Sequence, residues 1–307
     1  MKICVIGGTG HIGRFLSPGL VRDGHDVTVV TRGETPKTAD PEWKQVKSAQ
    51  ASYKSGQAFH DALAELEFEV LIDILGDDVP ALYRNAKGRI DHLLLCGSIW
   101  MFGSARAVPT PDGTQTPCPF EGYDKRYEEM QQTRDQAKED GVAFSAIMPP
   151  NICGPGKIPL ECMGGRSLDV HKAHQRGEPV PLPEGCNTLV GPCDAEDIAA
   201  AFRLAVQNRD GADGEIFNVG SAYALTASQL VETFGNIYGV EIPINWVTYE
   251  KYTQDILPEF GANFHFLSHM CPDISKLRSR VGYEPAQTPE STLERAVKWM
   301  FDEGLLS

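Results

Sequence analysis

Long apolar runs are absent from this sequence of 307 residues. No segment approaches the ~20 consecutive apolar residues that a membrane-spanning helix needs, and the apolar stretch at the N-terminus is too short for a secretory signal peptide. The eight cysteines show no CxxC spacing. We therefore expect a cytoplasmic protein with reduced thiols, several of them serving as small core residues.

Positive charge is in short supply. The chain has 28 lysines and arginines against 42 aspartates and glutamates, which gives a net charge of -14. Such a chain is repelled by a phosphate backbone, so we expect a small-molecule substrate and neither a nucleic-acid nor a membrane partner. A local basic pocket for a small anion stays compatible with this charge.

Short apolar stretches alternate with helical ones over the first half. Strands are predicted at 2–6, 26–30, 69–75, 91–97 and 142–148, and helices at 11–22, 57–66, 79–87 and 122–140. Strands that lack polar alternation and are separated by helices indicate a parallel sheet covered on both faces. The sequence therefore predicts an α/β fold.

A glycine-rich loop, 7-GGTGHIG-13, follows the first predicted strand and opens the first predicted helix. Gly7 permits a tight turn, Gly10 lets a pyrophosphate approach the backbone, and Gly13 lets the helix pack closely. The strand and helix on either side favour a dinucleotide site of the Rossmann type over a turn without a ligand. The other loop residues expected to contact the cofactor are Thr9, His11 and Ile12.

The second predicted strand ends in 31-TRG-33, without the acidic residue that would bind a ribose 2′-hydroxyl. Arg32 is suited to pair with a 2′-phosphate. We therefore expect NADP to be preferred over NAD. The alternative is that Arg32 points into solvent and NAD is used.

The composition changes after Pro149-Pro150. Residues 149–186 predict long loops with one helix near 166–176, after which regular structure returns at 194–208, at 214–220 and in helices opened by a Thr226/Gln229 capping box and by Thr288-Pro289. The expected organisation is a dinucleotide-binding domain at 1–150, rejoined by about 187–222, and a smaller C-terminal substrate-binding lobe from 151–186 and 223–307. The site would lie in the cleft between them.

Motifs along nearly the whole chain resemble the extended short-chain dehydrogenase/reductase family, the NAD-dependent epimerase/dehydratase group. They are 7-GGTGHIG-13, 96-CGSIWMFG-103, 149-PPNICGPG-156, 194-DAEDIA-199, 215-EIFNVGS-221 and 273-DISKLRSRVGYEP-285. The resemblance implies a doubly wound parallel sheet and hydride transfer between a nicotinamide cofactor and a sugar, nucleotide sugar or related polyol. The motifs do not distinguish an epimerase from a dehydratase or reductase.

The same resemblance assigns roles to single residues. Tyr123 takes the place of the catalytic acid/base, and Ser98 that of the serine that orients the substrate oxygen. Asn151 is expected to contact substrate. Two alternatives stay open for Arg166, in the variable lobe: it binds an anionic group of the substrate, or it is a surface charge. Further cofactor contacts are expected at Leu75, Gly76, Pro149 and Ile152.

The sequence departs from this family next to Tyr123. A lysine is expected four residues later, where Tyr127 stands. Free tyrosine titrates near pH 10, so an acid/base tyrosine must be shifted down by ~3 units, or about 4 kcal/mol. Arg126 is the predicted replacement cation, with a solvated helix charge as its alternative, and Tyr127 is expected to bond the nicotinamide ribose. In addition, Met148 replaces an expected arginine, and 46-VKSAQAS-52 offers no clear acidic residue for the adenine ring.

Several alternatives stay open. Without the lysine, the protein is either a rebuilt enzyme or a redox-silent dinucleotide-binding sensor or scaffold. Some proteins that resemble this family bind RNA, but the charge of -14 argues against that role here. The pairs His265/His269 and His171/His174 lack a third and fourth ligand, so we expect no metal there. The sequence leaves the oligomeric state open, with a homodimer as one alternative.

Overall fold

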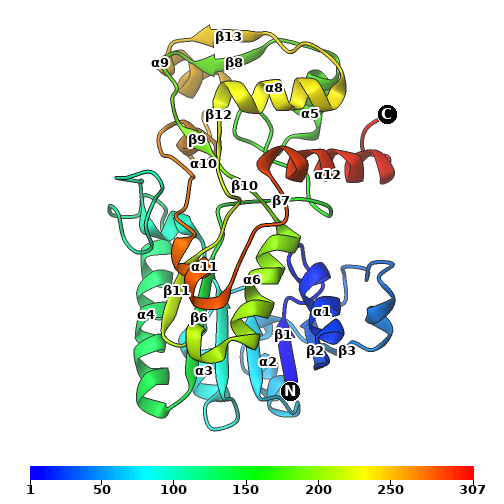
Figure 1. Cartoon of the computed structure of the whole chain (residues 1–307), viewed down its shortest axis with the longest axis vertical. Coiled ribbons are helices and arrows are strands. Elements are labelled where there is room, and N and C mark those ends of the chain that lie inside the picture. The colour runs from blue at the N-terminus through cyan, green and yellow to red at the C-terminus, as the bar shows by residue number, and fades with distance from the viewer.

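The computed structural model describes residues 1–307, and its largest element is a seven-stranded parallel sheet in the order β11-β6-β5-β4-β1-β2-β3 (Figure 1). The strands are β1 (Lys2–Ile6), β2 (Asp26–Thr31), β3 (Lys47–Gln50), β4 (Val70–Asp73), β5 (His92–Cys96), β6 (Ala143–Met148) and β11 (Glu215–Asn218). The strand order reverses between β1 and β4, which is where dinucleotides bind in this fold. The predicted Rossmann-type sheet is confirmed.

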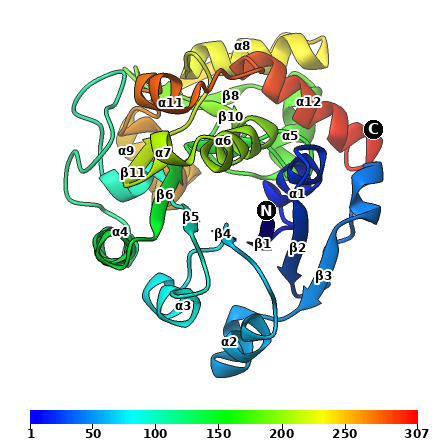
Figure 2. The same ribbon diagram turned by 60° about the horizontal axis from the view of Figure 1, so that its bottom comes forward.

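Helices cover both faces of the sheet (Figure 2). One face carries α1 (Gly13–Arg22), α6 (Ala195–Gln207), α7 (Arg209–Ala212) and α11 (Ser275–Val281), and the other carries α2 (Gln57–Ala64), α3 (Val79–Ala86) and α4 (Tyr123–Asp140). Successive side chains of β1 enter opposite cores: Ile3 and Val5 join the first, Cys4 and Ile6 the second. Burial on both faces explains why the central strands are mostly apolar.

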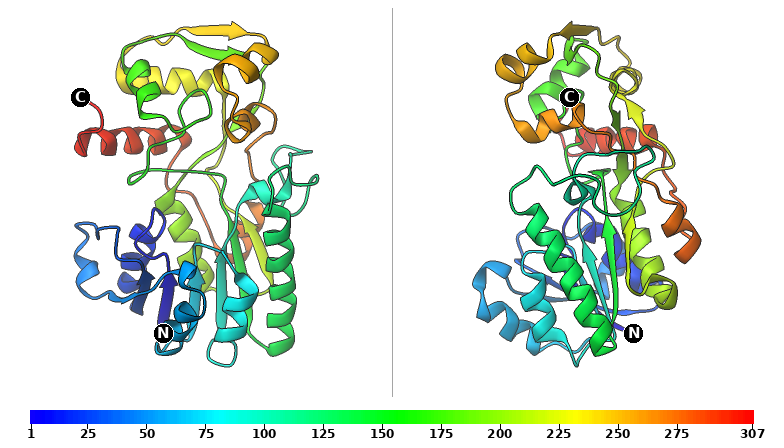
Figure 3. Two further views of the ribbon diagram at one scale, coloured as in Figure 1. Left: turned by 180° about the vertical axis from the view of Figure 1, so that it is seen from behind. Right: turned by 90° about the vertical axis from the view of Figure 1, so that its left-hand side faces the viewer.

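A smaller lobe lies over the carboxyl ends of the strands (Figure 3). Its elements are α5 (Leu168–Gln175), β8 (Val180–Pro183), β9 (Leu189–Val190), β12 (Leu225–Thr226), α8 (Ala227–Tyr238), β13 (Ile244–Val247), α9 (Tyr249–Lys251), η4 (Tyr252–Ile256), α10 (Phe260–Asn263), η5 (Phe264–Phe266) and α12 (Pro289–Asp302). A parallel pair, β7 (Asn151–Cys153) with β10 (Pro192–Asp194), connects it to the sheet domain. Three short turns, η1 (Pro41–Lys44), η2 (Tyr53–Ser55) and η3 (Ile99–Phe102), complete the chain.

Two helix starts appear as the sequence predicts. Thr226 and Gln229 form a reciprocal capping box, and Thr288 caps α12 with Pro289 in its first turn. The segment that holds α11 differs from expectation, because Leu277, Val281 and their neighbours pack into the core of the sheet domain. Residues 274–283 therefore lie with the sheet, although all of 223–307 was expected in the lobe. None of the helices combines the length and the apolar composition needed to cross a bilayer.

Candidate active site

The glycine loop joins the carboxyl end of β1, an inner strand of the sheet, to α1. Gly7 has a φ of 79°, and the amide of Gly10 donates to its carbonyl at 2.9 Å. A Cβ on Gly13 would lie 2.4 Å from the carbonyl carbon of Gly8, so the helix start touches the loop backbone. The amides of His11 and Ile12 donate to no protein group. These free amides at the N-terminus of α1 fit a pyrophosphate.

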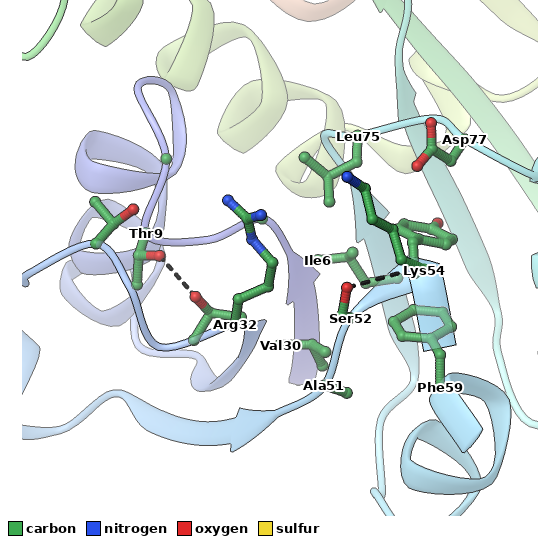
Figure 4. A pocket seen from close by; sticks show the side chains of 15 residues that line it. Ile6, Thr9, Val30, Arg32, Ala51, Ser52, Lys54, Phe59, Leu75 and Asp77 are labelled. Atoms are coloured by element: carbon green, nitrogen blue, oxygen red, sulfur yellow. Dashed lines mark hydrogen bonds between the residues drawn. The ribbon is translucent and has the colours of Figure 1, made fainter. Parts of the chain in front are cut away.

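A pocket of about 250 Å³ opens beside this loop (Figure 4). Apolar side chains, among them Val30 and Phe59, form its walls, and Arg32, Lys54 and Asp77 are its charged residues. Arg32 also pairs with Glu34 at 2.8 Å, but both side chains are more than half exposed, so the pair is weak. A pocket with apolar walls beside the glycine loop fits an adenosine, and its charged groups are two cations and one carboxylate. Sequence reasoning did not single out Lys54.

Asp73, at the end of β4, is a buried carboxylate with three donors. It accepts the hydroxyl of Tyr53 at 2.6 Å and the amides of Leu75 and Gly76 at 2.9 and 3.1 Å. Burial raises the pKa of Asp73, and these hydrogen bonds oppose the rise. This residue was missed, although a lone acid inside the apolar run 69–75 was a signal for it.

Tyr123 is the first residue of α4, and Arg126 lies against it. The Cζ atom of Arg126 is 5.6 Å from the centroid of the Tyr123 ring. Its Nη2 donates to the carbonyl of Leu75 at 3.0 Å. Lys125 points to the exposed face instead, where it pairs with Glu129 at 3.5 Å. The structure thus brings together Tyr123 and the cation that helix spacing suggested for it.

Ser98 and Tyr127 lie near opposite ends of η3. The Oγ of Ser98 accepts the amide of Trp100 at 3.3 Å. The Tyr127 ring packs edge-on against Phe102, 5.2 Å between centroids, and is 7% exposed. Burial raises the pKa of Tyr127, so its hydroxyl stays protonated as a hydrogen-bond donor.

The segment 149–156 contacts the glycine loop at one end and the turn after β5 at the other. The carbonyl of Pro149 accepts the amide of Ile99 at 3.2 Å, next to Ser98. His11 Nε2 lies 3.3 Å from the carbonyl of Gly154. Burial, with Lys157 nearby, lowers the pKa of His11 to about 3, so its ring is neutral. The segment therefore joins the glycine loop to the turn that carries the serine.

The two expected substrate residues differ in whether their side-chain donors already have protein partners. Asn151 is 6% exposed, and its Nδ2 is buried without a partner. Arg166 donates to the carbonyls of Ile158 and Ile152 at 2.7 and 2.9 Å. The guanidinium thus holds the chain around the cleft, which leaves fewer of its donors for an anion.

Comparison with known proteins agrees with this arrangement. Residues 80–220 match the family model described as the NAD dependent epimerase/dehydratase family. The matched stretch lies in the middle of this chain and holds Ser98, Tyr123, Arg126, Tyr127 and Asn151, while the glycine loop precedes it.

Individual relatives extend the similarity beyond residues 80–220. The UDP-glucose 4-epimerase of Lactobacillus helveticus is 23% identical and aligns over 97% of both chains. The chloroplast stem-loop binding protein of 41 kDa b from Arabidopsis thaliana is 26% identical over 79% of this chain, which spans 64% of that relative's length. A solved structure of UDP-glucose 4-epimerase with UDP-glucose from Thermotoga maritima superposes with a TM-score of 0.76 over 99% of this chain and 100% of that one, at 19% identity. That superposition supports the fold.

In each histidine pair of the lobe, at least one ring has a protein hydrogen-bond partner. His171 contacts the Tyr238 hydroxyl and the Pro159 carbonyl, both at 3.1 Å, and His269 Nδ1 accepts the amide of Leu189 at 3.2 Å. Burial lowers the pKa of His171, His174 and His265 to about 4. No three His, Cys, Asp or Glu side chains come together as a metal site.

Proposed function

We propose that the protein is an NAD(P)-dependent epimerase, dehydratase or reductase of a sugar, nucleotide sugar or related polyol. The observation that carries this proposal is the guanidinium of Arg126 against the ring of Tyr123. The same guanidinium donates to the carbonyl of Leu75, whose side chain lies over the glycine loop. The similarity to proteins named UDP-glucose 4-epimerase supports the substrate class.

The residues divide the work as follows. Bound nicotinamide supplies the hydride chemistry. Tyr123 takes the proton of the substrate hydroxyl or returns it, and Ser98 donates a hydrogen bond to the same oxygen. Arg126 places a positive charge against the ring of Tyr123. Tyr127 bonds the nicotinamide ribose, and Asn151, with its free amide, orients the rest of the substrate.

The pocket supports NADP as the preferred cofactor. Thr31 ends β2 with a hydroxyl that lies 2.9 Å from that of Thr9, so the strand ends in a neutral residue where a carboxylate would bind the ribose of NAD. Arg32 and Lys54 line the same pocket. A 2′-phosphate there would displace Glu34 from Arg32, because a doubly charged phosphate binds a guanidinium more strongly than an exposed carboxylate does.

A binding experiment followed by a turnover assay tests the proposal. NADP and NAD are titrated into the protein, and sugars, nucleotide sugars and polyols are then added with either cofactor. Oxidation or reduction changes the reduced-nicotinamide absorbance, whereas an epimerase leaves it unchanged and must be followed by product stereochemistry. We expect one class to react. Tight cofactor binding without any product across all three classes would support the redox-silent sensor or scaffold instead.

Stem-loop binding is a second candidate, because one relative bears that name. The net charge of -14 opposes it. Filter binding of an RNA stem-loop at low salt distinguishes the two. We expect no retention of the RNA.

A further inference from the structure

Asp73 links two parts of the cofactor crevice that are far apart in the sequence. Its side chain is 0% exposed, and a buried carboxylate is costly unless donors surround it. One donor, Tyr53, lines the adenosine pocket, and the other two, Leu75 and Gly76, form the loop after β4, of which Leu75 lines the same pocket. The carboxylate therefore holds the pocket wall and this loop in one arrangement.

The loop after β4 lies between the glycine loop and α4. Gly76 has a φ of 61°, and a Cβ there would lie 3.0 Å from Nη2 of Arg126 and 3.3 Å from the carbonyl of Cys96. On the other side, the Leu75 side chain closes over Gly7, where a Cβ would lie 3.1 Å from it. A shift of this loop would be transmitted directly to Arg126.

Arg126 depends on the loop for its position. Its protein hydrogen bond goes to the Leu75 carbonyl at 3.0 Å, and its Nε is buried without a partner. No carboxylate forms an ion pair with it, so the backbone of this loop decides where the charge lies relative to Tyr123. The charged and titratable groups around Asp73 are Asp77, Arg126, Tyr53, Cys4 and Cys96.

We propose that Asp73 is a positioning residue for the acid/base. Through Leu75 and Gly76 it fixes the guanidinium of Arg126 against the ring of Tyr123, and through Tyr53 it couples that arrangement to the adenosine pocket. The role of Tyr123 itself rests on the proposed function. Asp73 touches no reacting atom, and its effect on the tyrosine passes through Arg126.

A titration of Tyr123 in the cofactor-free protein tests this without turnover. The tyrosinate absorbance of each protein is measured against the same protein with Tyr123→Phe, so the other tyrosines cancel. Asp73→Asn keeps the size of the side chain but turns one acceptor into a donor. We expect it to raise the midpoint of Tyr123 by about half a pH unit or more, because a displaced cation favours tyrosinate less.

The same substitution in an Arg126→Gln background separates positioning from the direct charge of Asp73. If Asp73 acts through Arg126, the rise disappears in that background, since coupled residues are not additive. Equal shifts in both backgrounds, or no shift in either, would overturn the proposal.

Gly76→Ala is the second variant, in case Asp73→Asn does not fold. It pushes on Arg126 and leaves the carboxylate in place. We expect the same rise, again dependent on Arg126, and an unchanged midpoint would count equally against the proposal. If no substrate is ever turned over, the proposed function fails while this titration still gives its answer.

Discussion

The sheet domain and the smaller lobe are held together in different ways. In the sheet domain, parallel strands of four to six residues bury apolar side chains on both faces, and Gly13 lets the first helix touch the loop backbone. In the lobe, strands are two to four residues long, and buried polar groups join the loops. Tyr252, for example, donates to the Met163 carbonyl at 2.7 Å, and Glu161 accepts the amide of Gly165 at 2.9 Å.

This difference separates the two halves of the candidate site. The cofactor half is fixed by the backbone geometry of its glycines, which few other residues can adopt. The substrate half is fixed by side-chain hydrogen bonds, whose strength depends on protonation. Changes in the first half should abolish binding, and changes in the second should alter how stability responds to pH.

The largest effect is expected from Gly10→Asp. A Cβ at Gly10 meets only the carbonyl of Gly7, at 3.2 Å, so the variant should fold. Its carboxylate would occupy the place of the pyrophosphate, and each lost charge-assisted hydrogen bond costs about 1.5–3 kcal/mol, so dinucleotide affinity should fall at least about a hundredfold. Equilibrium dialysis measures this. Gly24→Asp, the same change at an exposed turn, is the control and should bind normally.

The second prediction concerns the buried carboxyl of Glu161. Burial raises the pKa of Glu161 to about 7. An unfolded glutamate titrates near 4.3, so the unfolded state loses this proton first, and the contribution of Glu161 to stability should decline by roughly 3 kcal/mol as pH rises from about 4.5 to about 7. Buried histidines with lowered pKa values act in the opposite direction, so the decline is measured as the difference between the wild type and Glu161→Gln, which lacks it.

Urea unfolding at a series of pH values measures the slope. Glu178→Gln, at an exposed position of the same lobe, should keep the wild-type decline. If Glu161→Gln followed the wild-type slope, the lobe would not be held by this carboxyl as described.

The third prediction returns to the cofactor half. Arg32→Ala should weaken NADP binding by about 1.5–3 kcal/mol, the size of a lost charged hydrogen bond, and leave NAD nearly unchanged. Lys54→Ala should act in the same direction and less strongly. Calorimetric titration with both cofactors measures the difference, and equal losses for NADP and NAD would exclude a 2′-phosphate contact.

The smallest expected effect is a change of pH optimum in Tyr127→Lys. An ammonium near Tyr123 favours the tyrosinate, so the optimum of turnover should fall by about one pH unit. Because Tyr127 packs against Phe102, Tyr127→Met is the matched control for lost packing and should leave the optimum in place. An optimum that moves equally in both variants would attribute the effect to packing alone.

Local patterns predicted much of the sheet domain. Strands such as Val70–Asp73 and Ala143–Met148 are buried on both faces and mostly apolar, so single stretches of sequence reveal them. The strand Lys47–Gln50 escaped notice because it is a polar edge strand. In the lobe, Ile244–Val247 pairs with Val180–Pro183, far away in the chain, and no local pattern predicts such a pairing.

The candidate site shows the same limit. The neighbourhood of Arg126 and Tyr123 follows from helix spacing and was predicted. The network of Tyr53 and Asp73 arises from contacts between separate segments, and the glycine motifs give no sign of it. The role of Arg166 also needed the structure, because its guanidinium donates to two backbone carbonyls that no sequence pattern points to.

The most direct test of a working acid/base is the turnover of Tyr123→Phe beside that of the wild type, with NADP affinity measured on both. The ring is retained, so cofactor affinity should stay within about twofold, while turnover should fall by about 10²–10⁴, the usual contribution of a general acid/base. Turnover by the phenylalanine variant at the wild-type rate would remove Tyr123 from the mechanism.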